Sequence, residues 1–174
     1  MKYINNNLLS EPIYFDEYND YKKFIDFDIQ GNILILEDSL GEKFCVIKFV
    51  DSLDDHLKLI LGFNYDNKDN IRFVFLPNTD KIVLILSEKI YIISIVDKSV
   101  RAKVTTFLPI PIIGIHVMQK RKRFLILEEI GYKIIDFDGQ IVKEESFDLI
   151  SDFSLKNDEL KITLYNGENK KIML

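Results

Sequence analysis

Short apolar stretches alternate with short polar stretches along almost the whole chain. Examples are "IVLIL" (residues 82–86), "YIISIV" (91–96), "FLIL" (124–127) and "YKIIDF" (132–137), each followed within a few residues by Gly, Asn, Asp, Glu or Lys. Such stretches are too short for typical helices, and they are rich in the β-branched and aromatic residues that suit a half-buried pleated surface. The pattern predicts an all-β protein.

The pattern also repeats. Residues 71–100 and 112–141, aligned without gaps at an offset of 41, are identical at nine of thirty positions, among them Leu84 with Leu125, Tyr91 with Tyr132 and Asp97 with Asp138. Within the second copy, strands are expected at 112–118, 123–129, 132–137 and 141–146. The Asp138–Gly139 pair is a strong signal for a hairpin turn between the last two. Each repeat is therefore predicted to form four antiparallel strands.

Weaker copies of this layout extend to both ends of the chain. We predict a single domain, residues 1–174, with repeat units at approximately 21–64, 71–110, 112–150 and 151–174. The last unit is incomplete, and an N-terminal strand from residues 1–20 is one candidate to complete it, which would also cover exposed strand edges.

Two segments interrupt the strand pattern. The stretch "DSLDDHLKLILGF" (51–63) fits either a helix that begins after Ser52 or a strand from Leu57 to Phe63, and the repeat favours the strand. The stretch "DEYNDYKKF" (16–24) carries tyrosines near helical spacing and is a candidate for one short helix.

Antiparallel four-stranded units with a period of about 40 residues resemble the blades of β-propellers, of the general WD40 or PQQ-like kind. The resemblance concerns layout alone, because the Gly-His and Trp-Asp signatures of WD40 blades are missing and the chain contains no Trp. It implies a small or partial propeller, with an open, curved meander as the alternative.

Composition and charge narrow the classes of function. The longest apolar runs fall far short of the roughly 20 residues that cross a bilayer, no secretory signal pattern is recognisable, and Cys45 is the single cysteine. We therefore expect a cytoplasmic protein without a membrane partner.

The charge is unevenly distributed along the chain. Residues 1–70 contain fourteen acidic and seven basic side chains, an excess of seven negative charges, whereas residues 71–174 contain fourteen acidic and sixteen basic side chains. An acidic surface disfavours nucleic acid as a partner.

No pattern of catalytic residues is recognisable. The histidines, His56 and His116, lack the spacing of a metal or hydrolase site, and no nucleophile elbow or phosphate-binding loop occurs. The carboxylate pairs Glu128/Glu129 and Glu144/Glu145 are expected to be solvated. The basic stretch "QKRKR" (119–123) is interpreted as a charged hairpin tip, or alternatively as a contact for phosphate or an acidic partner. We predict no enzyme activity, no cofactor and no metal site.

A small all-β repeat protein without catalytic residues is expected to be a binding module. Its C-terminal segment, "YKIIDFDGQIVKEESFDLISDFSLKNDELKITLYNGENKKIML" (132–174), resembles in its turn pattern the closing part of small bacterial immunity proteins of contact-dependent toxin systems. The resemblance implies a protein that neutralises a cognate toxin, such as a nuclease, by covering its active site.

A toxin with a basic groove would attract the acidic N-terminal half of this chain. The residues predicted to contact it are Asp51, Asp54, Asp55, Asp66 and Asp69. The alternatives are a propeller-type scaffold for another protein partner, and an enzyme whose site the sequence does not reveal.

Overall fold

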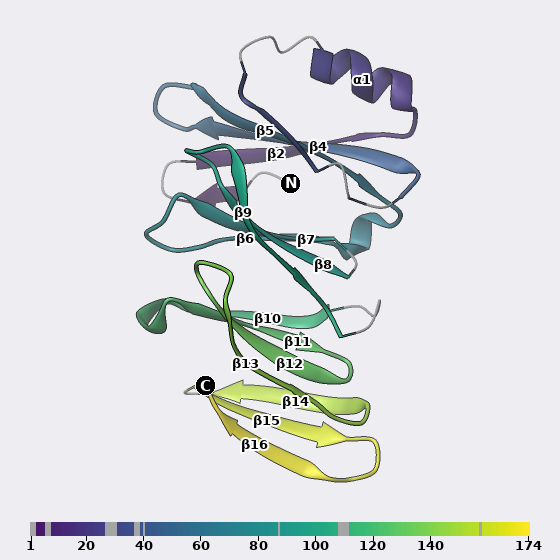
Figure 1. Ribbon diagram of the computed structural model, residues 1–174, viewed down its shortest axis with the longest axis vertical. Coiled ribbons are helices and arrows are strands. Elements are labelled where there is room, and N and C mark those ends of the chain that lie inside the picture. Colours follow the sequence, from purple (N-terminus) through teal and green to yellow (C-terminus); the bar gives the residue numbers. More distant parts are fainter. Residues whose placement is uncertain are drawn as a thin grey trace. The chain divides into compact units, whose positions relative to one another are not determined.

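The structure is a computed structural model that describes residues 3–5, 8–26, 31–36, 39, 41–86, 88–107, 112–156 and 158–174 (Figure 1). Within these ranges the chain is mostly β-strand, with one α-helix and two short 3-10 helices. The predicted all-β class with one short helix is confirmed. None of the described helices is long and apolar enough to cross a membrane.

The N-terminal sheet contains five strands in the order β1-β2-β4-β5-β3. These strands are β1 (Tyr3–Asn5), β2 (Leu8–Phe15), β3 (Ile33–Leu36), β4 (Lys43–Asp51) and β5 (Leu57–Tyr65). The predicted strand at Leu57–Phe63 is confirmed as part of β5. The purely antiparallel layout is wrong here, since β3 pairs with β5 in parallel.

The single helix, α1 (Tyr18–Asp26), confirms the helix suggested by "DEYNDYKKF". Tyr21 and Ile25, one turn apart, are buried on Val46 of β4 and Ile60 of β5. Residues 24–26, near the start of the first predicted repeat unit (21–64), end this helix and form no strand, and residues 27–30 lie outside the described ranges. The helix forms because its apolar positions follow the helical period and cover one face of the sheet.

Two four-stranded sheets follow, with the strand orders β6-β7-β8-β9 and β10-β11-β12-β13. The first contains β6 (Ile71–Phe75), β7 (Lys81–Leu86), β8 (Lys89–Ser94) and β9 (Ser99–Thr105), and the second β10 (Ile112–Met118), β11 (Arg123–Glu128), β12 (Gly131–Asp136) and β13 (Ile141–Ser146). A 3-10 turn precedes β6 (η1, Lys68–Asn70), and another lies between β10 and β11 (η2, Gln119–Arg121). The four-stranded antiparallel repeats are confirmed, and these sheets resemble propeller blades.

The last sheet has three strands, β14 (Ile150–Lys156), β15 (Glu159–Leu164) and β16 (Asn169–Met173), paired in that order. The suggestion that an N-terminal strand completes this sheet is wrong, because β1 pairs with β2 and β2 pairs with β4. The physical reason is that β2 forms a continuous eight-residue ladder with β4, which satisfies its backbone groups there.

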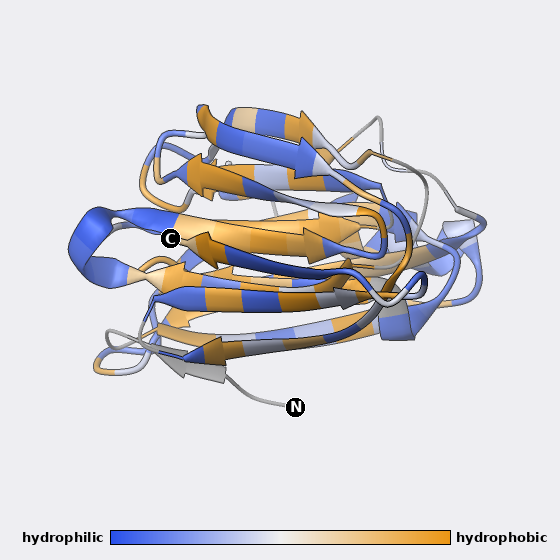
Figure 2. Cartoon of the chain, turned by 90° about the horizontal axis from the view of Figure 1, so that it is seen from below, coloured by the Kyte–Doolittle hydropathy of each residue, from blue (hydrophilic) through white to orange (hydrophobic). Residues whose placement is uncertain are grey.

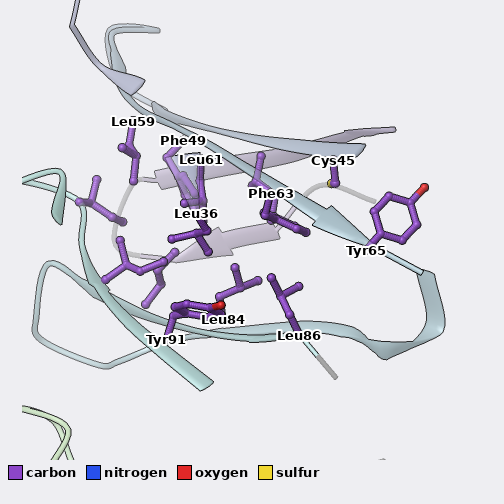
Figure 3. Close-up of a cluster of buried hydrophobic side chains, with 14 residues drawn as sticks. Leu36, Cys45, Phe49, Leu59, Leu61, Phe63, Tyr65, Leu84, Leu86 and Tyr91 are labelled. Atoms are coloured by element: carbon purple, nitrogen blue, oxygen red, sulfur yellow. The ribbon is translucent and has the colours of Figure 1, made fainter. Parts of the chain in front are cut away.

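The chain divides into two compact units, Met1–Leu86 with Tyr91–Arg101, and Ser87–Ile90 with Ala102–Leu174. In the first unit, Phe49 and Leu61 of β4 and β5 point toward Leu84 and Tyr91 of β7 and β8 in one buried cluster (Figure 3). In the second unit, a separate cluster joins the sheet β10–β13 to the sheet β14–β16, for example through Tyr132 and Leu160. Apolar and polar residues alternate along many strands (Figure 2), as one-sided burial requires.

Candidate functional site

The second unit carries an open hollow of about 410 Å³ at the start of β10 and β14. Its lining comes from β10, the β11–β12 turn, β14 with the residues before it, and the β15–β16 turn. The lining residues are Ile113, Glu129, Leu149, Ile150, Ser151, Asp152, Phe153 and Tyr165. None of them is among the site residues predicted from the sequence.

Two β-bulges shape this hollow. The register of β10 against β11 shifts between Ile112 and Gly114, and the register of β14 against β15 shifts between Ile150 and Asp152. A bulge re-aims neighbouring side chains and is common beside functional sites. The ring of Phe153 lies against Gly114, where an added Cβ would be 3.5 Å from the Phe153 Cζ atom. The edge strands β10 and β14 therefore lie next to each other here.

Backbone hydrogen bonds fix the rim of the hollow. The Ile150 amide donates to the Glu129 carbonyl at 2.8 Å, and the Tyr165 amide donates to the Leu149 carbonyl at 2.9 Å. Tyr165 belongs to a hairpin turn in which Gly167 has a φ of 86°, a conformation that glycine adopts without strain. The β11–β12 turn, the start of β14 and the β15–β16 turn are thus held together.

The hollow is apolar and aromatic but also negatively charged. Phe153 is 40% exposed and Tyr165 75% exposed, and Leu149 is half exposed as well. Two carboxylates, Glu129 and Asp152, line the same space, and no lining residue is cationic. Aromatic faces and carboxylates both attract a cation, so this surface suits a lysine or arginine side chain on a protein partner.

The five acidic residues predicted as a partner-binding surface form two separate groups. Asp51, Asp54 and Asp55 lie at the connection between β4 and β5, whereas Asp66 and Asp69 follow the far end of β5. A nine-residue strand spans roughly 27 Å at about 3.3 Å per residue. The structure therefore does not bring all five residues into one patch, and their role in binding stays a prediction.

The carboxylates of Asp51 and Asp54 form local hydrogen bonds, and Asp51 also forms an ion pair. Asp51 accepts from the Leu53 amide at 3.0 Å and pairs with Lys58 at 3.4 Å, and these interactions hold the pKa of Asp51 below its usual value. Asp54 accepts from the His56 amide at 2.9 Å. Asp55 has a φ of 54°, so it occupies the left-handed position of this turn. These carboxylates shape the turn as well as charging it.

One predicted solvated residue is in fact buried. Glu128 is 1% exposed, its Oε2 atom accepts from the Phe107 amide at 2.6 Å, and its Oε1 atom has no partner within the described part of the chain. Burial raises the pKa of Glu128, against the opposing effects of this amide and of Lys133. The expectation that Glu128 is solvated is wrong because Glu128 is buried and bonded to Phe107, which follows β9.

Lys133 completes this buried polar cluster. Its Nζ atom lies 2.6 Å from Glu144 Oε2 and 3.4 Å from the centre of the Phe107 ring, and its side chain is 5% exposed. Sequence reasoning missed the cluster because Glu128 and Phe107 lie 21 positions apart in the chain. The only signal was a lysine inside the apolar strand "YKIIDF".

The remaining candidate residues are the two histidines, the single cysteine and the basic stretch. His56 is exposed in the β4–β5 connection and His116 lies within β10. Cys45 is buried, and burial raises the pKa of its thiol to about 12. The basic stretch "QKRKR" covers η2, the left-handed residue Lys122 and the first residue of β11. In the described ranges no three metal-ligating side chains gather in one place.

Comparisons with known proteins give no family. No protein-family model matches the chain. No curated protein matches it either.

Among solved structures, the chain is similar to Hsv2 from Kluyvelomyces marxianus, with 10% identity and a TM-score of 0.48 over 75% of this chain and 44% of that one. It is similar to BamB from Moraxella catarrhalis, with 7% identity and a TM-score of 0.46 over 76% and 41%. It is also similar to the computationally designed Ika4 protein, with 12% identity and a TM-score of 0.49 over 82% and 90%. The chain thus spans less than half the length of the two natural proteins.

Proposed function

We propose that this protein is a non-catalytic protein-binding module that holds its partner at the hollow beside β14. The observation that carries the proposal is the group of exposed apolar side chains, Leu149, Phe153 and Tyr165, on a rim fixed by backbone hydrogen bonds. Aromatic residues in rigid, partly enclosed positions are the residues that contribute most to protein interfaces. The module needs neither a cofactor nor a metal.

The charge of the hollow defines the complementary partner surface. Glu129 and Asp152 favour a partner that inserts a lysine or arginine, whose aliphatic stem would pack on Phe153 and Tyr165 while its charge meets the carboxylates. The partner is therefore a protein with a basic surface, which is also the kind of surface that the acidic N-terminal half would attract.

The narrower proposal is that the partner is a bacterial toxin domain and that the chain is its cytoplasmic immunity protein. Its support is the resemblance of residues 132–174 to immunity proteins, together with the position of the hollow. Six of the eight lining residues, Leu149 to Phe153 and Tyr165, belong to that segment. An inhibitor of this kind requires a rigid complementary surface and no chemistry of its own.

A growth-rescue experiment tests both the binding role of the hollow and the narrower proposal of an immunity protein. Bacteria expressing individual toxin domains with basic active-site surfaces are co-transformed with the full chain, and we expect one cognate toxin to be neutralised. The double variant Phe153→Ala with Tyr165→Ala should lose rescue. The matched control, Val96→Ala with Val100→Ala, removes two exposed apolar side chains outside the hollow and should keep it.

The outcomes separate the proposals. Rescue that survives the Phe153→Ala, Tyr165→Ala variant would place the contact elsewhere. Absence of rescue by any toxin would remove the immunity role and leave the scaffold for another protein partner. Turnover of a small molecule by the purified chain would support the enzyme alternative instead.

A further inference from the structure

The second unit carries opposite charges at the two ends of strand β10 (Figure 1). At the start of β10 lies the hollow beside β14, with the carboxylates of Glu129 and Asp152. At its end lies η2, which forms a basic turn with its neighbours, residues 119–123. The strand between them has seven residues and spans roughly 20 Å at about 3.3 Å per residue. The basic turn therefore lies too far away to reach the hollow of its own chain.

The backbone of the basic turn is fixed, and its side chains face solvent. Lys122 closes the 3-10 turn in the left-handed conformation, with a φ of 50°, and its amide donates to the Gln119 carbonyl at 3.1 Å. Residues 119–122 are all exposed. The turn therefore presents its positive charges outward from a defined backbone.

Most of these positive charges are unpaired. Arg121 lies 3.7 Å from Asp158 in the β14–β15 connection, and both side chains are about half exposed. Exposed pairs of this kind contribute little free energy. Lys120 and Lys122 have no ion-pair partner in the part of the chain that the structure describes. The basic turn thus offers two lysines to carboxylates on another surface.

The hollow beside β14 has the properties that these lysines require. Asp152 Oδ1 accepts from the Phe153 amide at 2.8 Å, which orients this carboxylate, and the Glu129 carboxylate has no side-chain partner among the described residues. The exposed rings of Phe153 and Tyr165 lie beside them, where they can pack on a lysine stem and attract its charge. The two ends of the unit are therefore complementary in charge.

We propose that the hollow beside β14 binds the basic turn of a second copy of this chain, so that Lys120 and Lys122 meet Glu129 and Asp152 of the neighbouring copy. Because each copy carries one basic turn and one hollow, the contact is head-to-tail and leads to a ring or an open series of copies. The proposal rests on the same preference for cations as the proposed function. Since one hollow holds one occupant, a neighbouring copy and a basic partner protein compete for it.

Sedimentation velocity of the full chain over a range of concentrations tests the contact. We expect the mean sedimentation coefficient to rise with protein concentration at low salt, and added salt to reduce this rise by screening the charges. Lys120→Gln with Lys122→Gln should raise the Kd of self-association about tenfold, the scale of two lost exposed ion pairs. The matched control, Lys22→Gln with Lys23→Gln, removes the same charge from α1 and should leave the Kd unchanged.

A mixture of two variants distinguishes the head-to-tail contact from a symmetric dimer. Glu129→Gln with Asp152→Asn neutralises the hollow and keeps the acceptor that bonds the Phe153 amide. This variant keeps its basic turn, whereas Lys120→Gln with Lys122→Gln keeps its hollow. Each variant alone should stay monomeric at concentrations where the wild type associates. Mixed together, they should form a 1:1 complex that does not grow further.

A peptide provides a direct readout at the hollow. The peptide "MQKRKRF", residues 118–124, is titrated into the isotopically labelled variant Lys120→Gln with Lys122→Gln, and NMR amide shifts are followed. We expect shifts at Leu149, Phe153 and Tyr165. A control peptide with glutamine in place of both lysines should bind about tenfold more weakly.

Three results would overturn the proposal. A sedimentation coefficient that does not change with concentration would exclude self-association. Equal weakening by the two pairs of lysine substitutions would show that the basic turn has no specific part in it. Mixed variants that stay monomeric would show that the turn and the hollow do not meet. These results leave the proposed function standing, because Lys120→Gln with Lys122→Gln keeps the hollow intact and should keep growth rescue.

Discussion

The backbone amide of Phe107 donates a 2.6 Å hydrogen bond to Glu128, a carboxylate buried inside the second unit. The other oxygen of Glu128 has no partner in the described ranges, and an unpaired buried polar atom costs about 1–3 kcal/mol. This carboxylate therefore holds the backbone of Phe107 in place at some cost to stability.

The stability of the fold should depend on the charge of Glu128. Burial raises the pKa of Glu128 in the folded protein above the ordinary value of 4.5. At pH values between these two pKa values, Glu128 is therefore protonated in the folded state and ionised in the unfolded state. The contribution of Glu128 is fully present below pH 4.5 and is lost as the pH rises through the folded pKa. Glu128→Gln removes this titration. We expect the wild type to lose stability relative to the variant from pH 4.5 upward, as measured by urea unfolding.

Glu129→Gln is the control for this experiment, because it removes one negative charge from the adjacent position at the hollow. A constant difference between the wild type and the Glu128→Gln variant across the pH range would contradict the assignment.

The ion pair between Lys133 and Glu144 should stabilise the sheet β10–β13. Lys133→Met keeps most of the apolar stem but removes the charge that contacts Glu144 and the Phe107 ring. We expect a loss of about 1–2 kcal/mol in the free energy of unfolding. Lys161→Met, at an exposed position of β15, should change it by less than about 0.5 kcal/mol. Equal effects of the two substitutions would show that the buried cation contributes nothing specific.

Two glycines in the second unit should respond differently to an added methyl group. At Gly131 a Cβ atom would lie 2.3 Å from the Glu145 carbonyl oxygen, so the backbone of β13 must move. Gly131→Ala should destabilise the protein by about 1–3 kcal/mol. At Gly114 the nearest atoms are 3.5 Å away, which is ordinary contact, and Gly114→Ala should be nearly neutral. Thermal unfolding of both variants measures the difference.

The acidic turn between β4 and β5 tests the electrostatic part of the proposed function. Replacing Asp51, Asp54 and Asp55 with Asn keeps the side-chain acceptors that bond the turn and suits the left-handed position of Asp55. If this end of the hairpin attracts a basic partner, the association rate should fall, and its salt dependence should weaken, because screening acts over about 10 Å at 0.1 M salt.

The matched variant for that experiment is Asp66→Asn with Asp69→Asn, which neutralises the opposite end of β5. Stopped-flow association with the toxin identified by the growth-rescue experiment, at two salt concentrations, distinguishes the contributions of the two ends of β5. An unchanged rate in both variants would show that the acidic residues serve only solubility.

The sequence predicted the middle of the fold better than its ends. The segment 71–146 combines apolar alternation with a repeated turn pattern, so each strand can be assigned from local residues. The N-terminal sheet depends on the pairing of β2 with β4 and of β3 with β5, contacts that no local pattern specifies. The same reason explains why we wrongly expected an N-terminal strand to complete the sheet β14–β16.

The candidate site was not predictable in the same way. The hollow beside β14 joins residues from β10 to the β15–β16 turn, and two bulges set its geometry. The nearest signal was the strand "ISDFSLK", in which Phe153 stands between polar residues instead of within an apolar run. The acidic excess of the N-terminal half led us to predict a binding surface that includes Asp51 and Asp66. An excess of charge in the sequence does not show that the charged residues lie in one patch.

The buried cluster that joins the sheets β10–β13 and β14–β16 has a consequence for folding. Leu160 and Ile162 of β15 pack with Tyr132 and Ile134 of β12, so neither sheet covers its apolar face alone. Repeat proteins gain much of their stability from interfaces between neighbouring units. Opening of β14–β16 should therefore expose the core face of β12, and the two sheets are expected to unfold as one cooperative segment whose amides exchange at a common rate.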